Sequence, residues 1–161
     1  MTEQGEASVG EGAKGRGGER IKTHRELRVW QNAMDLAKEI FKTSKSFPAD
    51  ERFSLTDQIR RSSRSVPANI SEAWRKRRYE AAFVSKLSDA EGEAAETQTH
   101  LELALRCGYV SKAQVVALDE RYEHLLAQLV TMIDHPEKWA IPRTPSPRPI
   151  SRSPARPLSP Q

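Results

Sequence analysis

Hydrophobic positions along this chain recur at intervals of three and four residues in four long stretches, a pattern typical of amphipathic helices. The most regular stretch runs from about Tyr79 to Arg106. Its apolar and small residues follow a 4-3-4-3-4-3 order: Phe83, Leu87, Ala90, Ala94, Thr97, Leu101 and Ala104. This order predicts a helix with one continuous seam. Gly92 lowers the helix propensity of the stretch by about 1 kcal/mol, so we expect close packing at this position to compensate.

The first stretch extends from about Glu26 to Ser46. Its apolar face comprises Trp30, Ala33, Ala37, Ile40 and Phe41. Pro48 ends the predicted helix, because a proline disfavours helical geometry in the residue before it. Asp50 follows two residues later and can cap the next helix.

The last stretch begins at Ser111, whose spacing to Gln114 is that of a capping box. Its apolar positions again alternate by three and four: Val115, Leu118, Tyr122, Leu125, Leu129 and Met132. Pro136 ends this predicted helix. Gly108 precedes it and stands where the C-terminal cap of the previous helix is expected.

The second stretch contains a proline, Pro67, near its middle. Apolar residues continue in helical phase from Ile59 to Trp74 on both sides of it. Pro67 removes a backbone donor and clashes with the carbonyl of Ser63, so a kinked but continuous helix is the favoured interpretation. The alternative is a true break, with Ser65 capping a new helix.

Four amphipathic helices with short connections predict an all-α protein, an up-down-up-down four-helix bundle over residues 25–139. Residues 1–24 are rich in Gly and Glu and lack an apolar period, so we expect them to be disordered. Residues 140–161 alternate proline with Ser, Thr and Arg, which predicts a disordered tail.

Candidate chemistry is sparse in this sequence. The single cysteine, Cys107, excludes an internal disulfide and fits a reducing cytoplasm. No apolar run approaches the roughly 18 residues that a membrane span requires. The four histidines lack metal-site partners at convincing spacing, and Cys107 has no base placed beside it by the sequence. We therefore expect no catalytic, cofactor-binding or metal-binding residues, and no enzyme.

Charge is strongly segregated along the chain. Residues 27–140 contain 17 basic and 17 acidic side chains, and the four arginines of the tail alone supply the net charge of +4. Residues 57–78 nevertheless contain seven basic and only two acidic side chains, and residues 79–102 contain six acidic and one basic. The basic residues form one group before Pro67 and one at the end of the helix: Arg60, Arg61 and Arg64, then Arg75, Lys76, Arg77 and Arg78.

Two interpretations of this basic segment remain open. It is a phosphate-binding surface, with an affinity that is largely electrostatic and depends on salt. Alternatively, its side chains pair with acidic residues of the next helix, within the bundle or across a subunit interface: Asp89, Glu91, Glu93 and Glu96. Only Trp74 and Tyr79 are candidates for an aromatic platform that stacks on bases.

Particular segments carry a family resemblance. Leu27-Arg28-Val29-Trp30 opens the first helix, and residues 47–74 read FPADERFSLTDQIRRSSRSVPANISEAW. The later residues that carry it are Phe83, Leu87, Ala90, Gly92, Glu96, Leu101 and Gly108-Tyr109. Over roughly residues 26–135 the chain resembles the bacterial four-helix-bundle proteins often encoded in intervening sequences of large-subunit rRNA genes. It departs from them at Ala73-Trp74, where a glycine is usual nearby, at Glu93, where serine is common, and in the Arg/Pro tail.

The resemblance implies a ring-shaped homopentamer. A related branch of the family serves as accessory proteins of diversity-generating retroelements, so the resemblance also implies nucleic acid and a reverse transcriptase as partners. Together with the charge pattern, this favours a non-enzymatic oligomer that binds RNA or DNA through the basic second helix. The alternative is a protein-binding scaffold without affinity for nucleic acid.

Overall fold

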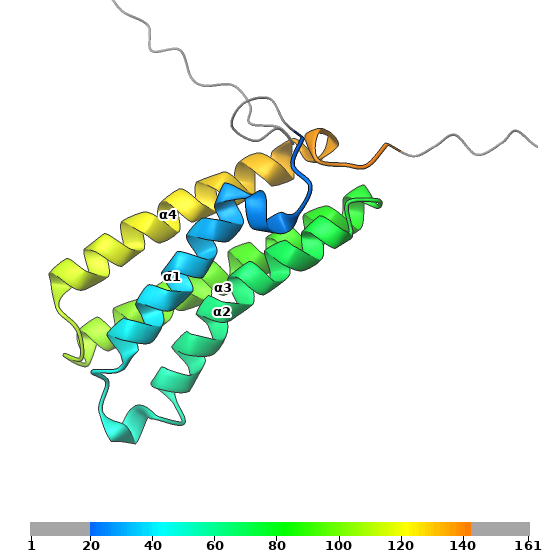
Figure 1. Cartoon of the computed structure of the whole chain (residues 1–161). Helices are drawn as coiled ribbons and strands as arrows, with labels where there is room; N and C mark the ends of the chain where they lie inside the picture. Colours follow the sequence, from blue (N-terminus) through cyan, green and yellow to red (C-terminus); the bar gives the residue numbers. More distant parts are fainter. Residues whose placement is uncertain (1–19, 143–161) are drawn as a thin grey trace, which may run out of the picture.

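The computed structural model describes residues 20–142, and its main elements are four long helices. These are α1 (Arg28–Ser44), α2 (Leu55–Arg75), α3 (Glu80–Arg106) and α4 (Lys112–Asp134). Three short 3-10 turns accompany them: η1 (His24–Glu26), η2 (Ala49–Glu51) and η3 (Pro136–Lys138). Consecutive helices run in opposite directions, as Figure 1 shows. The all-α, up-down-up-down architecture is confirmed for the described residues.

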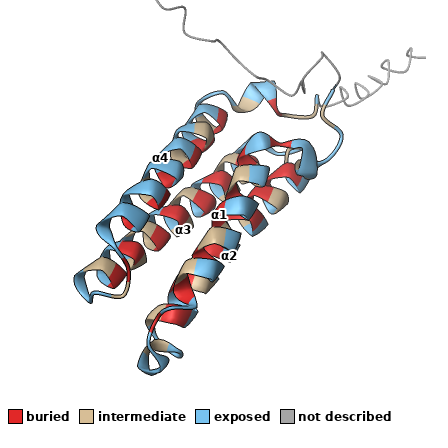
Figure 2. Ribbon diagram, turned by 60° about the vertical axis from the view of Figure 1, so that its left-hand side comes forward, coloured by how far each residue is buried: buried red, intermediate tan, exposed pale blue. Residues whose placement is uncertain are grey.

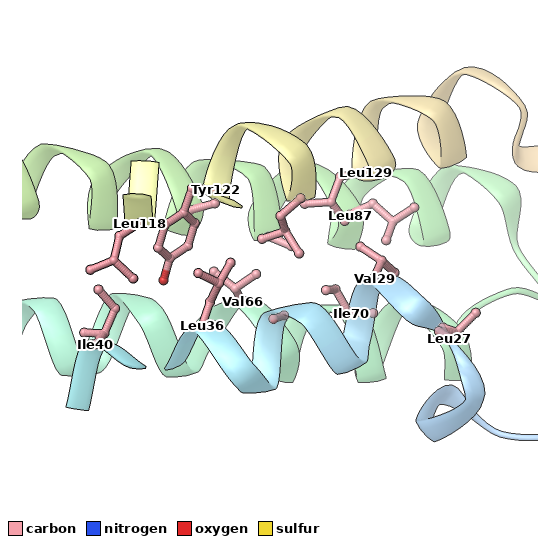
Figure 3. Packing of buried hydrophobic residues seen from close by; sticks show 14 of the residues in the cluster. Leu27, Val29, Leu36, Ile40, Val66, Ile70, Leu87, Leu118, Tyr122 and Leu129 are labelled. Atoms are coloured by element: carbon pink, nitrogen blue, oxygen red, sulfur yellow. The ribbon is translucent and has the colours of Figure 1, made fainter. Parts of the chain in front are cut away.

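The predicted seams face the core. All seven seam residues of α3 are buried, and so are the six alternating apolar positions of α4. Figure 2 shows the buried positions of each helix turned toward the other helices, and Figure 3 shows their side chains meeting in one cluster. Helix α2 packs most extensively against α3. Burial of these apolar side chains is the main stabilising contribution to such a bundle.

The ends of α3 and α4 follow the sequence signals. Gly108 has a φ of 76°, the left-handed conformation that glycine adopts without a Cβ clash. The backbone N–H of Tyr109 then donates to the carbonyl of Ala104 at 2.9 Å. At the start of α4, the N–H of Gln114 donates to the Ser111 hydroxyl and the N–H of Ser111 donates to the Gln114 side chain. The capping box is confirmed.

The predicted cap of α2 is wrong. Asp50 lies within η2, and that turn delays the start of α2 until Leu55. Glu51 takes the capping role, because its carboxylate accepts the Leu55 N–H at 3.0 Å and the hydroxyl of Ser54. Its other oxygen accepts the hydroxyl of Tyr109 at 3.0 Å, which ties the α1–α2 connection to the α3–α4 connection.

Helix α2 continues through Pro67, so the alternative of a break is wrong. Pro67 is itself buried, together with Val66 and Ile70, and this packing holds the helix together where one backbone hydrogen bond is missing. Ser65 does not cap a new helix; its hydroxyl donates to the carbonyl of Arg61 one turn back.

Close packing around Gly92 is also a wrong expectation within the described chain. Gly92 faces solvent, and a Cβ added to it would meet no atom within 4 Å. The small residues that do admit a neighbouring helix are Ala90 and Ala94, which are fully buried. They lie on the seam of α3, whereas Gly92 lies outside it.

Few polar groups are buried in the core. The hydroxyls of Ser62 on α2 and Thr97 on α3 lie 2.8 Å apart, so the two satisfy each other between the helices. The buried hydroxyl of Tyr122 has no hydrogen-bond partner of good geometry among the described residues. Burial raises the pKa of Tyr122, and the nearby Thr97 offsets this only in part.

The predicted disordered tails lie mostly outside the described residues. Residues 20–24 of the N-terminal segment are described and Ile21 packs against the core, so the expectation of disorder is wrong there. Trp139, the last residue of the predicted bundle, is buried. The backbone N–H of Ile141 donates to the carbonyl of Arg77 at 3.3 Å, so the chain just after the bundle contacts the turn between α2 and α3.

Candidate nucleic-acid interface

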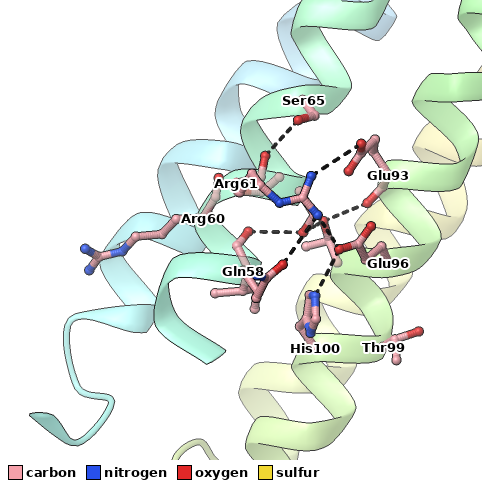
Figure 4. A network of polar contacts seen from close by, with 12 residues as sticks. Gln58, Arg60, Arg61, Ser65, Glu93, Glu96, Thr99 and His100 are labelled. Carbon is pink, nitrogen blue, oxygen red and sulfur yellow. Dashed lines mark hydrogen bonds and ion pairs between the residues drawn. The ribbon is translucent and has the colours of Figure 1, made fainter. Parts of the chain in front are cut away.

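The seven basic side chains of residues 57–78 do not share one face, and Lys76, Arg77 and Arg78 lie in the turn after α2. Arg60 and Arg61 are neighbours in sequence, so they point about 100° apart around the helix. Figure 4 shows Arg61 directed toward α3 and Arg60 directed away from it. Arg61 therefore meets different neighbours from Arg60, although both line the same groove together with Arg64.

Arg61 is the member of the set that pairs with acidic residues of α3. Its Nη2 lies 2.6 Å from Glu96 Oε1, and its Nη1 lies 3.7 Å from Glu93 Oε1. Glu96 also contacts His100 Nε2 at 3.3 Å (Figure 4). The Arg61 side chain is 49% exposed, so each pair contributes at most about 1 kcal/mol. Within the described chain the pairing interpretation holds for this one arginine, and pairing across a subunit interface stays a prediction.

The remaining acids of α3 are not used by the basic residues of α2 within the described chain. Lys86 contacts Glu72 at 3.0 Å and Asp89 at 3.3 Å, and these contacts raise the pKa of Lys86. The pKa of Glu91 is raised by partial burial and then by Asp134 of α4. Most of the positive charge of α2 is therefore not neutralised by α3.

Arg60 and Arg64 gather around an aromatic ring of α1. Their guanidinium carbons lie 4.8 and 5.7 Å from the centre of the Phe41 ring, and Lys45 Nζ lies 4.8 Å from it. Arg60 Nε also donates to the hydroxyl of Ser44 at 2.7 Å. Cations over an aromatic face are attracted by its quadrupole, so Phe41 orders these side chains.

A shallow groove of about 610 Å³ runs beside these arginines. Its lining comprises Arg52, Phe53, Thr56, Asp57, Arg60, Arg61, Arg64, Ser65 and Ala68. Phe53 is 86% exposed, and the Arg52 guanidinium lies 5.3 Å from its ring centre. We call this surface the arginine groove.

Sequence reasoning missed the aromatic part of the arginine groove. Phe41 was assigned to the apolar face of the first helix, and it lies at the edge of that face with 36% exposure. The hydrophobic pattern assigns no role to Phe53, although the adjacent pair Arg52-Phe53 in a connecting segment is a usable signal. The expectation that only Trp74 and Tyr79 offer aromatic rings near the basic residues is wrong.

The second basic group lies at the turn between α2 and α3. Arg77 Nε donates to the carbonyl of Trp74 at 2.7 Å, and its guanidinium carbon lies 3.3 Å from the Trp74 ring centre. Partial burial, followed by the like charges of Arg20 and Arg75, lowers the pKa of Arg77. Arg77 therefore packs against the C-terminal end of α2, where its positive charge interacts favourably with the helix dipole.

The other three members of this group, Arg75, Lys76 and Arg78, are exposed. No ion pair to any of them occurs among residues 20–142. Tyr79 beside them is 62% exposed, whereas Trp74 is buried and cannot serve as an open platform. We call these three residues the turn cluster.

The same part of the chain holds no group of three or more His, Cys, Asp or Glu side chains arranged to bind a metal ion. Within it, none of the helices combines the length and apolar character needed to cross a bilayer. The two basic surfaces can bind anions. Where aromatic rings lie beside the cations, a nucleotide can place its base on a ring and its phosphate on a cation.

Comparison with known proteins assigns the chain to a family. The chain is similar to a crystal structure of a protein of unknown function from the S23 ribosomal protein family of Bacteroides thetaiotaomicron, with 30% identity and a TM-score of 0.60. The match covers 65% of this chain and 97% of the other. No curated protein matches. The family model of the 23S rRNA-intervening sequence protein matches residues 25–131, from before α1 to the last turn of α4. The chain belongs to the 23S rRNA-intervening sequence protein family.

Proposed function

We propose that this protein is a non-enzymatic nucleic-acid-binding protein that contacts phosphates through the basic side chains of α2 and the turn that follows it. The observation that carries this proposal is the lack of acidic partners. Of the seven basic residues, only Arg61 forms an ion pair with a described acidic side chain. Basic side chains that cluster on one part of the surface without acidic partners are typical of surfaces that bind polyanions.

The spacing of the two basic surfaces supports the same proposal. Arg64 and Arg75 are eleven residues apart on one helix, which corresponds to about 16 Å along its axis. That distance is comparable with the width of about 12 Å of the major groove of B-form DNA, so on a DNA duplex the arginine groove and the turn cluster can reach phosphates on either side of one groove. The link of the family to 23S rRNA in its name favours RNA over DNA.

The resemblance adds an assembly to this proposal. A homopentamer would repeat both basic surfaces around a ring, and effective concentration would then strengthen binding beyond that of one chain. Light scattering at micromolar concentration should give a mass several times 18.2 kDa. A strict monomer would contradict this part. A cytoplasmic role as accessory protein to a reverse transcriptase is proposed on the resemblance alone.

The test of nucleic-acid binding removes the arginine-rich tail first, because its four arginines would also attract polyanions and confound the measurement. In a chain ending at Trp139, the turn cluster is replaced as Arg75→Ala, Lys76→Ala and Arg78→Ala. Arg77 is retained because it packs on Trp74. Binding to structured RNA and to duplex DNA is measured across a salt series.

The parent should lose affinity steeply with salt, and the triple variant should show a slope reduced by about 0.9 for each lost contact on duplex DNA. The matched control replaces three exposed basic residues elsewhere, Lys38, Lys112 and Arg121, with alanine. It changes the net charge equally and should change binding much less. Equal, weak and salt-insensitive binding by all three proteins would refute the proposal and favour the protein-binding scaffold.

A further inference from the structure

We propose that the arginine groove is a site for an unpaired base of a single-stranded nucleic acid, stacked on Phe53 with its neighbouring phosphates on Arg52, Arg60 and Arg64. This inference rests on the proposed function and specifies which form of nucleic acid the groove recognises. The turn cluster, in contrast, offers charge without a shaped groove and binds phosphates of paired and unpaired strands alike.

Phe53 is the first reason for this assignment. It is the most exposed of the large hydrophobic side chains in the described chain, at 86% exposure, and it lies in the connection that leads into α2. The Arg52 guanidinium lies over the ring at 5.3 Å, and an 86% exposed ring leaves surface for a ligand. Aromatic rings beside a positively charged groove are the combination that proteins use to bind single-stranded nucleic acid. Stacking on an aromatic face is available to every base, because every base has a π-face.

The ordered cations are the second reason. Arg60 is held by the Ser44 hydroxyl and the Phe41 ring, and Arg64 by the same ring. Side chains fixed in this way lose less conformational freedom when they bind a phosphate. Asp57 is the one acidic residue in the lining, and Arg61 is already paired with Glu96, so the groove keeps a net positive charge.

The third reason concerns why the groove should take an unpaired base and not a base pair: the Phe53 ring needs an open base face. In a duplex the base faces stack on one another, so a phenyl group cannot reach them without unstacking a step. An unpaired base can turn its face to Phe53, and a groove of about 610 Å³ lies within the usual range of about 300–1,000 Å³ for small-molecule sites.

The chain's own C-terminal tail is a poor occupant of the groove. Residues 143–161 contain four arginines and no acidic residue, so like charge opposes its binding there.

The experiment uses the full chain and fluorescence anisotropy with labelled oligouridine and with an RNA duplex of the same length. Phe53→Ala should weaken the affinity for oligouridine at least about fivefold, which corresponds to the lower end of the affinity loss seen when a stacking aromatic ring is replaced by alanine. The affinity for the duplex should not change. Phe53→Trp should restore oligouridine binding. Val116→Ala, which removes another exposed apolar side chain on α4, should have no effect on either probe. An oligodeoxyuridine should show the same dependence on Phe53, because stacking does not involve the 2′-hydroxyl.

The outcomes separate this inference from the proposed function. If Phe53→Ala binds oligouridine as the parent does, while alanine at the turn cluster weakens both probes, the inference is wrong and the proposed function stands. If the parent binds neither probe, both are wrong. If a polyglutamate peptide binds with the same dependence on Phe53, the groove accepts an acidic protein segment and the assignment to a base is overturned. Because Phe53 is so exposed, its replacement should leave the helical circular dichroism signal unchanged.

Discussion

Gly92→Ala is the sharpest test of how α3 is surrounded. Gly92 lies inside a helix of 27 residues, and a Cβ at this position would meet no heavy atom within 4 Å. Alanine therefore introduces no clash, and its higher helix propensity should raise the free energy of unfolding by about 0.8–1 kcal/mol. Part of this gain arises because alanine restricts the unfolded chain. For a chain of this size the melting temperature should rise by about 2–5 °C.

The assay is urea unfolding followed by circular dichroism at fixed protein concentration, with light scattering on the same samples. The matched control is Ala95→Gly, three residues further along α3 and likewise exposed, which should lower the free energy of unfolding by a similar amount. A loss of stability or a smaller particle mass after Gly92→Ala would refute the reasoning. Gly92 would then lie against another subunit, where a methyl group prevents close approach.

Three further predictions concern polar groups. The Ser54 hydroxyl and two other donors hold the pKa of Glu51 below its usual value, so its stabilising contribution is present at neutral pH and is lost as pH falls through its folded-state pKa. Glu51→Gln should therefore destabilise the protein at neutral pH and flatten its acid unfolding curve; an unchanged curve would contradict this. Thr97→Val should cost about 1 kcal/mol in urea unfolding because it removes the hydrogen bond between α3 and buried Ser62, which keeps only its longer bond to the Ile59 carbonyl; a neutral result would show that the pair contributes nothing. Tyr122→Phe should leave stability unchanged or raise it slightly, since it removes a poorly bonded buried hydroxyl; a loss above about 1 kcal/mol would indicate a real hydrogen bond there.

The helices and most of their ends could be predicted from the sequence. The seam from Phe83 to Ala104, the capping box at Ser111 and the glycine cap at Gly108 are local signals, because they depend on helical period and on bonds between residues close in sequence. The continuity of α2 through Pro67 was also readable, since the apolar residues remain in phase on both sides. The start of α2 was missed because Glu51 is fixed by Tyr109, which lies 58 residues away in sequence.

The segregation of charge into residues 57–78 was a property of the sequence alone, but the use of each charge was decided by tertiary structure. Helical rotation turns Arg61 toward the acids of α3 and Arg60 toward Phe41 of α1. Which of these contacts forms depends on which helices flank α2, and residue spacing within one helix does not contain that information. For the same reason, only the folded chain shows that Phe41 and Phe53 lie beside the arginines of α2, because each ring comes from a different element.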